Sequence, residues 1–200
     1  MKQIILFFFL VSLAISAAAQ GYKVGDKASD FKLLNVDGTM VSMADFNEAK
    51  GFIVMFTCNH CPYSVAYEDR KIELHNKFVD LGYPVIAINP NDTVVQPQDS
   101  FSKMQERAKA KGFPYPYLID AEQTVFKEYG ATRTPHVFLL NKENNDLVVR
   151  YIGAIDNNHE DASKATEKYV ESAIEALMNG KKIETEFTKA IGCTIKVKKS

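Results

Sequence analysis

The feature that most constrains the fold is an apolar run that leads directly into two closely spaced cysteines. Residues 51–56, GFIVMF, carry no charge, and TCNHCP follows at residues 57–62. A short uncharged apolar run is typical of a strand buried on both faces, as in the centre of a parallel sheet. Pro62 suits the first turn of a helix, where its missing N–H costs no hydrogen bond. We therefore expect the cysteines at the carboxyl end of a central strand, where chemistry gathers in open α/β sheets.

Apolar strands alternate with amphipathic helices along the rest of the chain. Further strands are expected at 83–90, 136–141 and 147–153, and helices at 62–81, 100–112, 121–130 and 161–178. This alternation predicts an α/β fold with a central, mostly parallel sheet flanked by helices and a final antiparallel pair of strands. Ahead of it, the turn signal Asp37-Gly38 between apolar residues predicts an N-terminal β-hairpin.

Net charge narrows the class of partner. The chain has 24 Lys and Arg residues against 25 Asp and Glu residues, a net charge of −1. It therefore lacks the basic excess that holds a phosphate backbone, and nucleic acid is not an expected partner.

The first twenty residues have the pattern of a secretory signal. A lysine at position 2 precedes an apolar run at 4–13, and Ala17 and Ala19 occupy the −3 and −1 positions of a cleavage site. A membrane anchor is the weaker alternative, because the run is short for a bilayer span and ends in alanines. We expect an exported protein, periplasmic or extracellular, with no stable membrane anchor after cleavage.

In an exported protein the cysteines can take part in disulfide chemistry, because disulfides persist outside the cytoplasm. Cys58 directly follows the strand, and the unpaired N–H groups at the start of the next helix favour a thiolate there. We therefore expect the pKa of Cys58 to lie below the usual value of about 8.5. Cys61 lies one helical turn further on, where it can resolve a mixed disulfide formed by Cys58. A cationic His60 between them would favour the thiolate further.

The sequence CNHCP at 58–62, placed after an apolar strand, resembles the active site of the thioredoxin superfamily. A second landmark of that superfamily, a cis-proline ahead of a strand, is matched by Thr134 and Pro135. Residues 24–46 resemble the N-terminal hairpin of the AhpC/TSA and TlpA-like branch. The similarity covers roughly residues 21–180. It implies a thioredoxin fold, thiol–disulfide chemistry without an organic cofactor, and a backbone at Thr134 and Pro135 that faces a partner chain.

The chain departs from that superfamily at several positions near the cysteines, including the one that takes up a proton. Thr57 stands where most members have Trp, and the strand at 52–57 lacks the buried acid that many thioredoxins use to deprotonate the second cysteine. Besides water, the groups left to carry that proton are His60, His136, Glu68 and Asp69. The peroxiredoxin pattern Pro-x-x-x-Thr-x-x-Cys is not met, so thiol peroxidase activity is kept as an alternative function.

Metal binding is the other alternative. Thiolates of Cys58 and Cys61, with His60 and His136 as further ligands close by, are suitable for Cu(I) or Zn(II). Sco-type copper chaperones have the same fold, but three residues separate their cysteines instead of two, which weakens this hypothesis. His75 and His159 fall on expected helix or loop surface and are interpreted as solvated.

Cys193 lies apart from the other two cysteines, near a strand expected at 194–197. It is a passive thiol, a third redox thiol that exchanges with Cys58, or a link to another chain, and the sequence leaves these open. The expected organisation is a signal peptide at 1–19, a thioredoxin-like domain at 20–180 and a C-terminal tail at 181–200. The expected partner is a protein or small molecule that carries a thiol or a disulfide.

Overall fold

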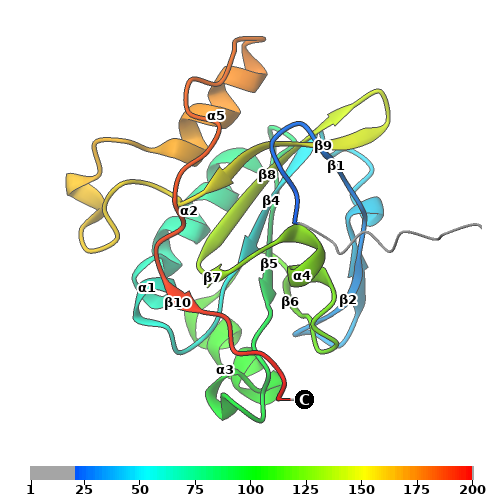
Figure 1. Ribbon diagram of the computed structural model, residues 1–200, viewed down its shortest axis with the longest axis vertical. Helices are drawn as coiled ribbons and strands as arrows, with labels where there is room; N and C mark the ends of the chain where they lie inside the picture. Colours follow the sequence, from blue (N-terminus) through cyan, green and yellow to red (C-terminus); the bar gives the residue numbers. More distant parts are fainter. Residues whose placement is uncertain (1–20, 200) are drawn as a thin grey trace, which may run out of the picture.

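The computed structural model describes residues 21–199 and has an eight-stranded mixed sheet at its centre (Figure 1). The predicted signal peptide lies outside the described residues. The strands are β1 (Lys27–Ala28), β2 (Lys32–Asn35), β3 (Met40–Ser42), β4 (Gly51–Phe56), β5 (Val85–Asn89), β6 (Tyr117–Ile119), β8 (His136–Glu143) and β9 (Asp146–Gly153). They lie in the order β1-β9-β8-β4-β5-β6-β2-β3. Two further strands, β7 (Arg133–Thr134) and β10 (Cys193–Thr194), form a separate antiparallel ladder.

In the part of the chain that the structure describes, the strands are accompanied by five α-helices and three short 3-10 turns. The helices are α1 (Pro62–Ala66), α2 (Glu68–Phe78), α3 (Phe101–Lys111), α4 (Val125–Tyr129) and α5 (Tyr169–Met178). The 3-10 turns are η1 (Met43–Asp45), η2 (Pro97–Asp99) and η3 (Ala162–Lys164). Within residues 21–199, no helix combines the length and the apolar character that crossing a bilayer requires.

Strand β4 is buried on both faces, which explains its uninterrupted apolar sequence. Ile53 and Met55 pack on one face of the sheet against α2, α3 and α5. The alternate residues of β4 pack on the other face against α4 and the N-terminal hairpin. The carboxyl end of β4 is therefore fixed between two cores, and the segment that follows it starts from a rigid position.

The predicted α/β fold and the N-terminal hairpin β2–β3 are confirmed. The sheet is less parallel than expected, because only β4, β5 and β6 pair in parallel. Two helices are also shorter than expected. α5 begins at Tyr169 instead of residue 161, and α4 begins at Val125 because the carboxylate of Asp120 accepts hydrogen bonds from the backbone N–H groups of Thr124 and Phe126.

The tail after α5 returns across the domain toward α3, and Figure 1 shows β10 (red) beside β7. Thr188 anchors its first part, since its hydroxyl lies 2.6 Å from the Tyr151 hydroxyl and accepts a bond from the Ala154 N–H. Ile195, only 4% exposed, anchors its last part in the core. The tail is thus held on both sides of Cys193, where the expected strand at 194–197 is replaced by β10.

Candidate active site at the end of strand β4

The two neighbouring cysteines lie where the sequence predicts, between a central strand and a helix. Cys58 follows β4 after one residue, and Cys61 is the N-cap of α1 with Pro62 in the first turn. Both cysteines are buried, with exposed fractions of 3% and 0%. The peptide bond between Thr134 and Pro135 is cis, as the resemblance implies.

The bond that the structure contains joins Cys61 to Cys193, with the two Cα atoms 6.0 Å apart, and leaves Cys58 as the free thiol. The pairing of β10 with β7 brings the tail to this position, because it sets Cys193 opposite Thr134. Gly192 permits this approach, since a Cβ at that residue would lie 2.1 Å from the carbonyl oxygen of Thr134. The tail therefore covers the edge that the resemblance assigns to a partner chain.

Thr134 contacts both neighbouring sulfurs. Its hydroxyl lies 3.2 Å from Sγ of Cys58, and its carbonyl oxygen lies 3.1 Å from Sγ of Cys61. The hydroxyl of Ser64 lies 3.9 Å from Sγ of Cys58 on another side. A free thiol and one sulfur of a disulfide are thus held against the same residue, next to Pro135.

The expectation of a readily ionised Cys58 is wrong for this state of the protein. Burial raises the pKa of Cys58, and the negative charge of Asp99 raises it further. Hydrogen bonds from Thr134, from the backbone N–H of Cys61 and from Ser64 lower this pKa but do not compensate. The helix that follows has only five residues, so its dipole offers less than a long helix would.

Asp99 is a site residue that the sequence interpretation missed. It lies in η2, is fully buried, and accepts hydrogen bonds from the Asn59 N–H at 2.8 Å, from Asn91 Nδ2 at 2.7 Å and from His60 Nδ1 at 2.7 Å. His60 is therefore oriented by a carboxylate from a distant loop. The available signal was weak, because Asp99 stands just before Ser100, the N-cap of α3, where a capping role is the ordinary interpretation.

Lys71 is the second residue that the sequence did not reveal. Its side chain is 1% exposed, and Nζ donates to Thr57 Oγ1 at 2.9 Å and to the carbonyl oxygen of Ser64 at 3.2 Å. Burial lowers the pKa of Lys71 to about 8. In the sequence it is one of many charges on a helix, and nothing there distinguishes a buried lysine from a solvated one.

The acidic residues proposed as proton carriers are placed differently from one another. Glu68 is buried, and Arg107 binds it through two hydrogen bonds of 2.7 and 2.8 Å, with Nζ of Lys111 at 3.3 Å. Asp69 is exposed and points into solvent. Neither arrangement presents a free buried carboxylate to Cys58.

The histidines also divide. His136 is buried, and burial lowers its pKa to about 4, which favours the neutral imidazole near pH 7. His75, expected on the surface, is instead buried, and its Nδ1 accepts a hydrogen bond from the Val85 N–H at 3.3 Å. The side chain of His159 is 33% exposed.

The predicted metal-ligand set is assembled only in part, because Cys58 and His60 come together without Cys61 or His136. Within residues 21–199, the one group of potential ligands is Cys58, His60 and Asp99, whose ligand atoms lie within 4.8 Å of one another. Cys61 and His136 do not belong to it, and Cys61 is engaged in the disulfide. His60 and Asp99 also satisfy each other by a hydrogen bond, which accounts for their contact without a metal.

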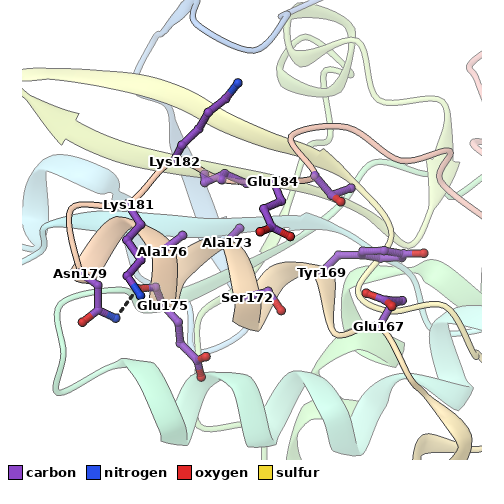
Figure 2. A pocket seen from close by; sticks show the side chains of 12 residues that line it. Glu167, Tyr169, Ser172, Ala173, Glu175, Ala176, Asn179, Lys181, Lys182 and Glu184 are labelled. Carbon is purple, nitrogen blue, oxygen red and sulfur yellow. Dashed lines mark hydrogen bonds between the residues drawn. The ribbon is translucent and has the colours of Figure 1, made fainter.

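A separate hollow of about 330 Å³ lies between α5 and the segment 181–185 (Figure 2). Figure 2 shows carboxylates and lysines around it, among them Glu175, Glu184 and Lys181. No cysteine or histidine lines this hollow. It therefore adds no redox group to the site at the end of β4.

Comparisons with known proteins agree with this geometry. A model of the AhpC/TSA family matches residues 24–152, a range that includes Cys58, Cys61 and Pro135 but stops short of the tail. Thiol-disulfide oxidoreductase ResA from Bacillus cereus is 25% identical over 157 residues, which cover 71% of this chain and 84% of that protein. The curated relatives are thiol-disulfide oxidoreductases, and the cysteines of this chain fit the same enzyme class.

Two solved structures match over nearly the whole chain. An uncharacterized conserved protein from Geobacillus kaustophilus has a TM-score of 0.82 and 33% identity, covering 90% of this chain and 95% of that one. A hypothetical protein from Sinorhizobium meliloti also has a TM-score of 0.82, with 30% identity and coverage of 90% and 98%. The sheet order, the cis-proline, the cysteine motif and the family match converge, and the chain belongs to the AhpC/TSA family within the thioredoxin superfamily.

Proposed function

We propose that this chain is an exported thiol–disulfide oxidoreductase in which Cys58 and Cys61 exchange disulfides and Cys193 acts as a third redox thiol. The observation that carries the proposal is the contact of both neighbouring sulfurs with Thr134. This residue holds the free thiol of Cys58 beside a disulfide sulfur of Cys61. The curated relatives named as thiol-disulfide oxidoreductases support the same chemistry.

The exchange needs no external oxidant when it starts from this state. Cys58 loses its proton, and its thiolate attacks Sγ of Cys61, so that a Cys58–Cys61 bond forms as the Cys61–Cys193 bond breaks. Cys193 leaves as a thiolate and takes up a proton. One disulfide and one thiol are present before and after, and the neighbouring cysteines become the disulfide that can oxidise a partner.

The tail defines how a partner would reach this site. β10 pairs with β7 at Thr134, beside Pro135, which is the edge that the family resemblance assigns to a partner chain. A partner that uses this edge must displace the pairing, and the internal exchange removes only the covalent link between the tail and Cys61. A partner with an extended segment next to its cysteine fits the same edge, because backbone hydrogen bonds would replace those of β10.

The experiment compares single Cys→Ser variants for exchange with a chromogenic aromatic disulfide and with insulin. Cys58→Ser should abolish the exchange of the reduced protein, because the attacking thiol is gone. Cys61→Ser should accumulate the mixed disulfide on Cys58, visible by mass spectrometry. Cys193→Ser should keep the first attack but should yield only Cys58–Cys61 on reoxidation, as shown by peptide mapping.

The proposal fails if the Cys58→Ser variant exchanges as fast as the unchanged protein. Peptide mapping of the unchanged protein, trapped in acid after partial oxidation, should find both Cys61–Cys193 and Cys58–Cys61. Recovery of the first bond alone, at every stage, would make Cys193 a structural cysteine. Export is tested separately, since the N-terminal sequence of the secreted chain should begin at Gln20.

A further inference from the structure

Lys71 is a buried cation without a carboxylate of its own. It projects from α2, and both hydrogen-bond acceptors of its Nζ are neutral oxygens, from Thr57 and Ser64. Among residues 21–199, no carboxylate lies within salt-bridge distance of Lys71, although burying an ammonium group without a counter-charge is costly.

The nearest acid on the same helix is engaged elsewhere. Glu68 is one turn before Lys71, but Arg107 binds both of its carboxylate oxygens and Lys111 approaches one of them. Two cations from α3 thus share the charge of Glu68. Glu68 raises the pKa of Lys71 but does not compensate the effect of burial, and a thiolate at Cys58 would add a second negative charge.

Both residues that accept hydrogen bonds from Lys71 are neighbours of Cys58. Thr57 is the residue directly before Cys58. The Ser64 hydroxyl accepts a bond of 3.9 Å from Sγ of Cys58, while the Ser64 carbonyl oxygen accepts one from Lys71. The Lys71 side chain and Sγ of Cys58 therefore contact the same serine from different sides. Strand β4 and helix α2, both anchored in the core, fix this arrangement.

We propose that Lys71 is a positioning residue whose ammonium group stabilises the Cys58 thiolate. The proposal rests on the proposed function, because it assumes that Cys58 is the attacking thiol. When the S–H bond breaks, the proton passes to water, the electron pair stays on sulfur, and the Lys71 ammonium compensates the new negative charge. The same charge stabilises Cys58 when it is released again as the leaving thiolate.

The groups that face Lys71 and Cys58 must be considered together. These groups are Glu68 on α2, Arg107 on α3, Tyr117 on β6 and Asp99 in η2. The charge of Glu68 raises the pKa of Lys71 and that of Arg107 lowers it, while the charge of Asp99 raises the pKa of Cys58. The Cys58 thiol has a raised pKa and Lys71 a lowered one, each because burial disfavours the charged form. The attraction between the thiolate and the ammonium would offset part of both desolvation penalties, so the two ionisations should be coupled.

The test uses the full chain with Cys61→Ser and Cys193→Ser, so that Cys58 is the only thiol. Lys71→Gln keeps an amide that can donate to Thr57 and Ser64 but removes the charge. It should raise the Cys58 pKa by about one unit, which makes the thiolate about tenfold less abundant below that pKa. Iodoacetamide should then react about threefold more slowly, since a more basic thiolate is also more nucleophilic.

Two matched variants separate charge from packing. Lys71→Arg should keep the Cys58 pKa near that of its parent. Lys77→Gln, on the exposed side of the same helix, should leave it unchanged because Lys77 is bound to Glu171 and Glu175. An unchanged alkylation pH profile in a folded Lys71→Gln protein would overturn the proposal.

A reciprocal measurement covers the case in which Lys71→Gln does not fold. Linkage requires that Cys58→Ser lower the Lys71 pKa, which lysine NMR signals report in the otherwise unchanged chain. An identical Lys71 pKa in both proteins would also overturn the proposal. Failure of the proposed function itself would look different, because the Cys58→Ser variant would then retain disulfide exchange.

Discussion

The buried imidazole of His136 should make the protein unstable in mild acid. Its pKa is lowered to about 4 by burial, against an ordinary value of about 6.5 in the unfolded chain. Between these pH values the unfolded chain binds more protons than the folded one, so the free energy of unfolding falls as the pH falls. The contribution is complete above pH 6.5 and is lost progressively toward pH 4.

The size of the effect follows from the shift. One pKa unit corresponds to 1.36 kcal/mol, so His136 should cost about 2 kcal/mol of stability at pH 5 and about 3 kcal/mol at pH 4, relative to pH 7.5. For a domain of this size, that is a large part of the total free energy of unfolding. The imidazole packs on Phe138 at 4.8 Å between ring centroids, and its one hydrogen bond comes from the Thr132 N–H at 3.4 Å, so nothing in the fold favours its charged form.

The assay is urea unfolding at pH 7.5, 5.0 and 4.0. Acidic side chains also titrate in this range, so the pH dependence of the unchanged protein must be compared with that of a variant lacking His136. His136→Asn keeps an acceptor for the Thr132 N–H but does not titrate. Between pH 7.5 and pH 5, the free energy of unfolding of this variant should fall by about 2 kcal/mol less than that of the unchanged protein. Equal slopes for the unchanged protein and His136→Asn, or an NMR-titrated His136 pKa above 6, would refute the reasoning.

Three further substitutions test other contacts. Asp99→Asn should lower the free energy of unfolding by about 2–4 kcal/mol in urea unfolding, because its amide N–H would face groups that now donate hydrogen bonds to the carboxylate. A change under 1 kcal/mol would contradict this network. Arg107→Met should cost about 1–2 kcal/mol, less than a fully buried pair, since Lys111 still approaches Glu68, and a double-mutant cycle with Glu68→Gln should show coupling between the two positions. Gly192→Ala should prevent the tail from reaching Thr134 and should lower the yield of the Cys61–Cys193 bond on air oxidation, measured by peptide mapping, while an unchanged yield would argue against the β7–β10 pairing.

The central part of the fold could be predicted because its signals are local. The apolar run at 51–56 identifies a strand covered on both faces, and Asp37-Gly38 identifies a hairpin from adjacent residues alone. The helix expected to start at residue 161 was wrong because periodicity continues through polar residues, whereas the structure begins α5 at Tyr169. Helix boundaries depend on capping groups such as Asp120, whose role is set only once the chain has folded.

The site was predicted only as far as its residues belong to recognisable motifs. Cys58, Cys61 and the cis bond at Pro135 carry recognisable motifs, whereas Asp99 and Lys71 have no motif because their importance comes from burial. A lysine on a helix is solvated in most proteins, and an aspartate before a helix is most often a cap. Only the three-dimensional packing of η2 and α2 against the end of β4 distinguishes these two residues from such ordinary examples.

The raised pKa of Cys58 and the position of the tail together describe a protein whose reactive thiol is protected until exchange begins. Burial slows ionisation of Cys58, and the tail covers the edge beside Pro135 while its cysteine is bonded to Cys61. Breaking that bond would not by itself free the tail, since Ile195 and Thr188 hold it on either side. The internal attack of Cys58 on Cys61 joins two sulfurs that both contact Thr134, whereas a partner chain must compete with a strand that is already docked. On this reasoning, the internal exchange should be faster than reaction with any protein disulfide, and small disulfides should react before large ones.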